Sequence, residues 1–226
     1  MRDARVGAVL RLADRGPPWI VVDFALDRII VANWPGRLWR VRVIEAASAR
    51  DQRQAGGQPN HQATYLRAIA VEILSEQSPA VLFGPHGSNL ISLFEQAASL
   101  NSQTAQRLAA ARSDAAPAAY DRVMRRWAQA AQVAVWEDNL DGVLKIGGGS
   151  PINGGLATLH RVVFERAISI GGPDAIAHDG EAVTLNEPWA TAAKVASDAA
   201  LALGAPQFAS GTDRRGLLEG WTSALT

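Results

Sequence analysis

Residues 78–98, SPAVLFGPHGSNLISLFEQAA, carry the densest run of local structural signals in the chain. An apolar segment at 80–83 is followed by a Gly-rich turn and then by apolar residues at helical spacing. The apolar segment fits either a short helix or a buried strand, because four residues do not distinguish the two periods. Ser88 or Asn89 is the expected N-cap of the next helix. The stretch therefore predicts a junction between two structural elements.

The turn in this stretch is the first candidate functional site. Free backbone N–H groups at a helix N-terminus favour an anion, and glycines let a phosphate or carboxylate approach closely. Neither GxxxxGK[ST] nor GxGxxG is present. One hypothesis is a small anionic ligand bound by Gly87, Ser88 and Asn89 beside Gly84, with His86 as a catalytic candidate. The other is a capped helix start whose glycines serve only the turn.

His160 is the second catalytic candidate. It lies on the apolar side of a helix predicted from Leu156 to about Ile168. The preceding segment 147–155, GGGSPINGG, predicts a loop of the kind that closes over ligands, or a plain connector. An enzyme would have a pocket between this loop, residues 84–89 and His160. A buried structural histidine is the alternative.

The first fifty residues predict antiparallel strands. WIVVDF at 19–24 is rich in β-branched and aromatic residues. The segments 28–33 and 37–46 are expected to form a hairpin, because the residues between them, Trp34-Pro35-Gly36, suit a type II turn. Residues 1–47 are therefore interpreted as an antiparallel β-meander or small barrel.

An interaction surface is the functional reading of the aromatic and basic residues in this β region. Trp34 is expected at a turn tip, and Trp39 and Arg40 follow in the return strand. Trp and Arg are enriched where proteins bind one another, so these three residues are candidates for contact with a protein partner or a second copy of the chain. Packing of the tryptophans in the core of a small sheet is the alternative.

The rest of the chain is predicted to be mainly helical. Residues 48–63 have no apolar periodicity and are interpreted as a linker, and a helical body then occupies 64–226, beginning with a helix over 64–76. A later hairpin joins 174–178 to 181–185, and Ser210 with Asp213 fits a capping box. The fold class is therefore α+β.

Composition excludes several classes of protein. Basic and acidic residues balance at 22 each, so neither nucleic acid nor an anionic membrane is an expected partner. The chain has no cysteine, which excludes disulfides and thiolate chemistry. No signal peptide or membrane span is evident, so a cytoplasmic location is expected. Richness in Arg and Ala, whose codons are GC-rich, indicates a bacterial source. No cofactor is expected, and residues 137–148 match a calcium loop too incompletely to predict a metal.

Two functions remain in view. The sequence has no GxSxG, HExxH or kinase signature, and this absence favours a non-catalytic protein that acts through protein contacts. The alternative is a small-molecule enzyme or ligand-binding protein with an anion-accepting pocket at 84–89.

Overall fold

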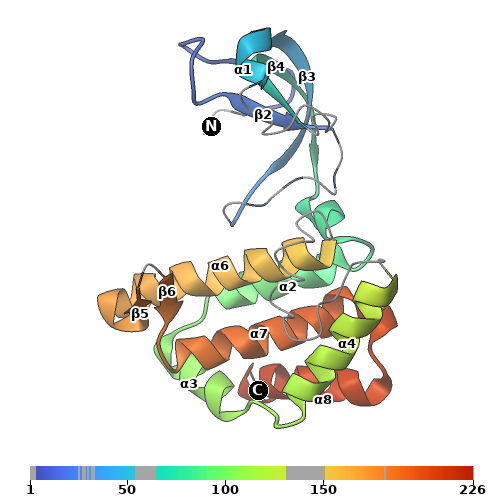
Figure 1. The fold of residues 1–226 in the computed structure, drawn as a ribbon, viewed down its shortest axis with the longest axis vertical. Coiled ribbons are helices and arrows are strands. Elements are labelled where there is room, and N and C mark those ends of the chain that lie inside the picture. Colours follow the sequence, from blue (N-terminus) through green and yellow to red (C-terminus); the bar gives the residue numbers. More distant parts are fainter. Residues whose placement is uncertain are drawn as a thin grey trace. The chain divides into compact units, whose positions relative to one another are not determined.

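The computed structural model describes residues 4–24, 26, 29, 31, 34–53, 65–130, 151–180 and 182–225 (Figure 1). The chain divides into two compact units. The sheet unit comprises Met1–Ile29 and Pro35–Val81, and the helical unit comprises Ile30–Trp34 and Leu82–Thr226. An N-terminal antiparallel sheet, a set of helices and a later hairpin confirm the α+β class.

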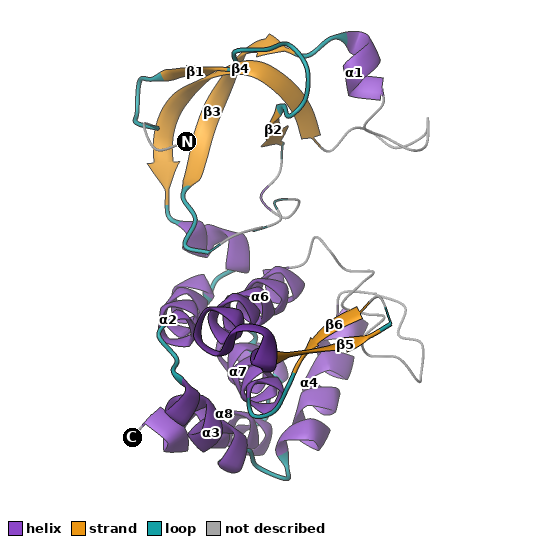
Figure 2. Cartoon of the chain, turned by 90° about the vertical axis from the view of Figure 1, so that its left-hand side faces the viewer, coloured by secondary structure: helices purple, strands orange, loops and turns teal. Residues whose placement is uncertain are grey.

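The sheet unit is organised around one long strand, β4 (Tyr65–Gln77). β1 (Val9–Arg11) and β2 (Ile20–Asp23) pair with successive parts of one edge of β4, both antiparallel. β3 (Leu38–Ala46) pairs antiparallel with the opposite edge. Figure 2 shows β3 and β4 bending strongly together. The sheet therefore has its longest strand in the middle and shorter strands along both sides.

The helix predicted over 64–76 is wrong, because these residues form β4. A strand that pairs on both edges and is covered on both faces reads as a continuous apolar run, which hides the two-residue period. Residues 68–71 are all buried. The alternation of β-branched Ile69, Val71 and Ile73 was the signal for a strand.

The hairpin predicted between 28–33 and 37–46 is also wrong in its pairing. The second segment does form a strand, β3, but its hydrogen-bonded partner is β4. Ile29 and Val31 lie outside any strand, and the other members of 28–33 lie outside the described residues. The turn-forming residues Trp34-Pro35-Gly36 therefore did not determine the partner of β3, which pairs with the later and longer strand β4.

A short helix, α1 (Ala49–Arg53), completes the described part of the sheet unit. The Gln52 side-chain amide donates to the Arg67 carbonyl at 2.6 Å and accepts from the Arg67 N–H at 3.0 Å. The amide thus satisfies backbone groups of β4 beyond the end of β3. The Arg67 guanidinium lies 4.4 Å from the centre of the Trp19 ring. Residues 54–64, with His61, lie outside the description.

The helical unit packs around α7 (Trp189–Gly204) (Figure 1). Contacts to α7 come from α2, α3, α4, α6 and α8. Most of the α7 face that meets them is alanine, which lets helices approach closely. None of the described helices is both long and apolar enough to cross a bilayer. The other elements are η2 (Pro79–Phe83), α2 (Gly87–Ala98), α3 (Ser102–Ala110), α4 (Ala116–Ala130), α6 (Pro151–Gly171), η3 (Gly172–Ala175), β5 (Ile176–Asp179), β6 (Ala182–Leu185), η4 (Pro206–Phe208) and α8 (Gly211–Leu225).

Local predictions in this unit are largely confirmed. The later hairpin is β5 paired with β6, and Gly180 in its turn has φ of 61°. The capping box is present, since the Ser210 hydroxyl accepts from the Asp213 N–H at 3.1 Å and the Ser210 N–H donates to the Asp213 carboxylate at 3.3 Å.

The glycine-rich loop predicted over 147–155 is wrong for its second part. Residues 151–155 form the first turns of α6, and residues 147–150 lie outside the description. A Cβ added to Gly155 would lie 2.8 Å from the Leu90 Cδ1, and one added to Gly204 would lie 3.0 Å from the same atom. Leu90 therefore fills a space between α6 and α7 that exists because both positions lack a side chain.

Candidate functional site

A cavity of about 390 Å³ lies along α7 in the helical unit. Its walls come from α7, β6, α6, α4 and the turn that follows α3, and its volume lies in the range of small-molecule sites. The side chains with polar or titratable groups in the lining include Arg112, Tyr120, His160, Lys194, Ser197 and Asp198.

The spacing of α7 creates one wall of this cavity. Ala190, Ala193, Lys194, Ser197 and Asp198 recur at intervals of three and four residues, which places them on one side of a helix. The two alanine side chains are small and leave space for the cavity. Lys194 and Asp198 supply charged groups, and Ser197 supplies a hydroxyl.

Asp198 is the deepest polar group of the cavity. It is 3% exposed, and its carboxylate accepts a hydrogen bond of 3.3 Å from Arg112 Nε, the one described for it. Burial raises the pKa of Asp198 to about 6, although the charges of Arg112 and Lys194 oppose that rise. A carboxylate has room for about four hydrogen bonds, so a single long one leaves most of its capacity unused. A buried carboxyl with a shifted pKa, lining a cavity, makes Asp198 a candidate functional residue.

Two cations and a histidine share the cavity with this carboxyl. The Arg112 side chain is 24% exposed, and Lys194 is exposed. The His160 ring is exposed on one side and stacks on Phe164, with ring centres 6.4 Å apart. Partial removal from water lowers the pKa of His160, so the ring is mainly neutral at pH 7. The cavity therefore carries more positive than negative charge at neutral pH.

The backbone that carries Arg112 is held by close helix packing. A Cβ added to Gly220 in α8 would lie 3.1 Å from the Ala111 carbonyl oxygen and 3.3 Å from the Arg112 Cα. Because Gly220 has no side chain, α8 packs closely against the C-terminal end of α3. Arg112 follows directly there, and its side chain extends to Asp198. A side chain at Gly220 would therefore press on the backbone of Ala111 and Arg112 without entering the cavity.

The structure gives the two predicted catalytic histidines different surroundings. His160 lines the cavity, whereas none of residues 84–89 is among its lining. The N-cap prediction is wrong, since α2 begins at Gly87 with His86 as the N-cap. Gly84 has φ of 77°, and its carbonyl accepts from the Gly87 N–H at 3.0 Å. The Asn89 N–H donates to the His86 carbonyl at 3.0 Å, so two N–H groups of the predicted anion site already have acceptors.

The three residues of the predicted interaction surface fall in different units. Trp34 is half-buried in the helical unit and meets Phe94 edge to face, with ring centres 5.3 Å apart. Trp39 belongs to the sheet unit and lies under the Arg37 guanidinium at 4.3 Å. Arg40 is exposed beside it. Trp39 and Arg40 are consecutive residues of β3, while Trp34 packs against a helix.

Sequence reasoning did not identify Arg112, Lys194 and Asp198. Arg112 and Asp198 are 86 positions apart, and no periodicity links them. The available signal was a single acidic residue placed directly before buried Ala199 and Ala200, in a helix otherwise packed by small residues. A carboxylate in such surroundings needs a partner from another element.

Comparison with known proteins finds no matching family model, no matching curated protein and no matching solved structure. Within the described ranges, no group of three or more His, Asp or Glu side chains is placed to hold a metal ion. The partial calcium-loop match at 137–148 lies outside those ranges.

Proposed function

We propose that this protein binds a small organic anion in the cavity beside α7. The observation that supports the proposal is the buried carboxyl of Asp198, which shares a cavity of about 390 Å³ with Arg112 and Lys194. Cations gathered at the wall of a small cavity favour a carboxylate or phosphate group.

The charge of the cavity sets the ligand preference. When Asp198 is ionised, its carboxylate engages Arg112 and offsets one positive charge. When Asp198 is protonated, Arg112 and Lys194 are both available to an anion. Because the pKa of Asp198 is about 6, anion affinity is expected to rise as the pH falls from 8 to 5.

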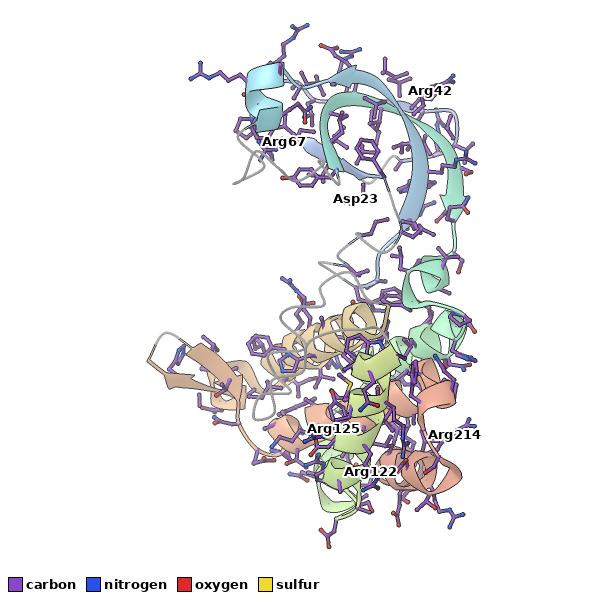
Figure 3. The ribbon with its side chains drawn as sticks, turned by 45° about the vertical axis from the view of Figure 1, so that its right-hand side comes forward. Asp23, Arg42, Arg67, Arg122, Arg125 and Arg214 are labelled. Atoms are coloured by element: carbon purple, nitrogen blue, oxygen red, sulfur yellow. The ribbon has the colours of Figure 1, made fainter. Side chains whose placement is uncertain are left out.

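The test is a titration of the full chain with succinate, acetate and inorganic phosphate, in which binding is measured by isothermal titration calorimetry. Lys194→Gln is expected to weaken binding about fivefold, the upper range for an exposed ion pair. Arg214→Gln is the matched control, since this exposed arginine of α8 is outside the cavity (Figure 3). Equal affinities in the two variants, or no binding of any of the three anions by the unsubstituted protein, would contradict the proposal.

The pH dependence identifies the group that controls binding. Asp198→Asn is expected to flatten the change in affinity between pH 5 and pH 8, while His160→Gln is expected to preserve it. The opposite result, a flat profile only in His160→Gln, would assign the control to the histidine.

Action through protein contacts stays a prediction, as do a cytoplasmic location and a bacterial source. The anion proposal concerns binding alone, and it shifts the expected anion site from the start of α2 to the wall of α7.

A further inference from the structure

We infer that the sheet unit has a second binding site, a groove that takes a single apolar chain with an anionic head group. The inference is independent of the cavity beside α7. It rests on the shape, the lining and the charge distribution of the curved sheet.

The groove has a volume of about 500 Å³ and is walled by all four strands. Its lining is mainly aliphatic, so it offers an occupant dispersion and burial rather than hydrogen bonds. The aliphatic residues that define it are Leu10, Ile20, Val22, Val41, Val71 and Ile73.

Large apolar side chains line the groove and remain in contact with water. Val21 is 57% exposed, Phe24 is 65% exposed and Leu26 is 50% exposed. Exposed apolar side chains that line a groove are typical of a binding surface.

Arg40 supplies the charge at one end of the groove. Its neighbours in β3 are engaged, since Arg37 pairs with Glu76 at 2.7 Å and Arg42 pairs with Glu72 at 2.6 Å. Arg40 lies opposite Ser75, and the part of the chain that is described gives it no ion pair. Arg40 and the next residue, Val41, both line the groove.

Asp23 and Arg40 carry opposite charges and lie near different ends of the groove. Asp23 lies opposite Tyr65, whereas Arg40 lies opposite Ser75, so the two charged groups are separated along most of β4. Burial raises the pKa of Asp23, which disfavours its ionised form. Figure 3 shows Asp23 within the curve of the strands and Arg42 on their outer side. An anionic head therefore belongs at the Arg40 end.

The lining favours an acyl-like chain over a segment of another protein. A peptide placed against these aliphatic walls would lose water from its N–H and C=O groups without receiving hydrogen bonds in return. A methylene chain has no such groups. It also follows a bent groove without the geometric demands of a peptide backbone.

The experiment measures binding of dodecanoate to the full chain by calorimetry, below the concentration at which the probe forms micelles. Undecyltrimethylammonium is the probe of opposite charge and equal alkyl chain length. Dodecanoate is expected to bind about fivefold more tightly than the ammonium. Decanoate is expected to bind about 15-fold more weakly than dodecanoate, from the transfer of two methylenes.

Arg40→Gln and Arg42→Gln are the matched variants, since both are exposed arginines of β3. Arg40→Gln should remove the preference for dodecanoate over the ammonium, and Arg42→Gln should retain it. Succinate should not displace dodecanoate, which separates this groove from the cavity beside α7.

Equal affinity for the two head groups in the unsubstituted protein would overturn the inference, as would equal effects of the two variants. No binding of dodecanoate, together with binding of an acetylated pentapeptide of four leucines and one glutamate, would replace the acyl chain with a protein segment. No binding of either probe would reject the groove as a site.

Discussion

The carboxylate of Asp213 is expected to contribute much of the stability of the helical unit. It is 2% exposed and lies in the first turn of α8. It accepts from the Ser210 hydroxyl at 2.7 Å, from Arg126 Nη1 at 2.7 Å and from Arg122 Nε at 2.9 Å. One side chain thus caps α8 and ties it to α4. These hydrogen bonds hold the pKa of Asp213 well below its usual value.

Replacement by Ala removes the cap and both arginine contacts. Loss of the cap costs about 1 kcal/mol. The arginine side chains are 49% and 43% exposed, so water replaces part of each lost contact, and we assign each about 1 kcal/mol. Asp213→Ala is therefore expected to lower the free energy of unfolding by about 3 kcal/mol. Asp213→Asn, which retains an acceptor, should cost about 2 kcal/mol.

The assay is urea denaturation followed by circular dichroism at pH 7 and at successively lower pH. The pKa of Asp213 is depressed on folding, so its stabilisation is complete above the unfolded value of 3.8. It is lost as the pH falls below 3.8 toward the folded value. The difference between the unsubstituted protein and Asp213→Asn should therefore shrink in acid. A difference that is constant with pH, or smaller than about 0.5 kcal/mol at pH 7, would refute this reasoning.

Asp121→Asn is the matched control for the loss of a carboxylate. Asp121 is exposed on α4, the helix that also carries Arg122 and Arg126. Its replacement should change the free energy of unfolding by less than about 0.5 kcal/mol. A loss as large as that of Asp213→Asn would indicate a general charge effect on α4.

Three further predictions follow from packing and burial. The pKa of Asp198 rises from 3.8 to about 6 on folding, so stability is lost as the pH rises from 3.8 through 6. Asp198→Asn should be about 2.5 kcal/mol more stable relative to the unsubstituted protein at pH 8 than at pH 4, by urea denaturation. Gly155→Ala should cost about 1–3 kcal/mol by the same assay, and Leu90→Ala in that background should cost less than it does alone, because it vacates the clash. Gly220→Ala should weaken succinate binding in calorimetry by displacing Arg112, and unchanged affinity would separate α8 from the cavity.

Local chemistry determined the parts of the fold that depend on neighbours in the chain. The Ser210–Asp213 capping box and the break at Gly84 need only a few consecutive residues, and both form as predicted. The later hairpin also forms, but Asp179, predicted as a turn residue, pairs with Ala182 inside it. The start of α2 shows where a few consecutive residues were not enough for a correct prediction. Its N-cap fell at His86 because the turn satisfied its own N–H groups, leaving Ser88 and Asn89 inside the helix.

The sheet depended on contacts that are distant in sequence. Residues 65–77 carry a pattern that also fits a helix, and β4 forms because β1, β2 and β3 supply hydrogen-bond partners along both of its edges. Strand pairing is a tertiary interaction, so its stability is not visible in one segment.

The candidate site depended most on the tertiary structure. The sequence alone made His160 a candidate, but not its neighbours, because Arg112 and Asp198 meet across 86 positions. Burial gives Asp198 its raised pKa, and burial is a property of the packed helices rather than of residue type. The amino-acid sequence determined the fold class and some local caps and turns, while only packing decided which charged side chains share a cavity.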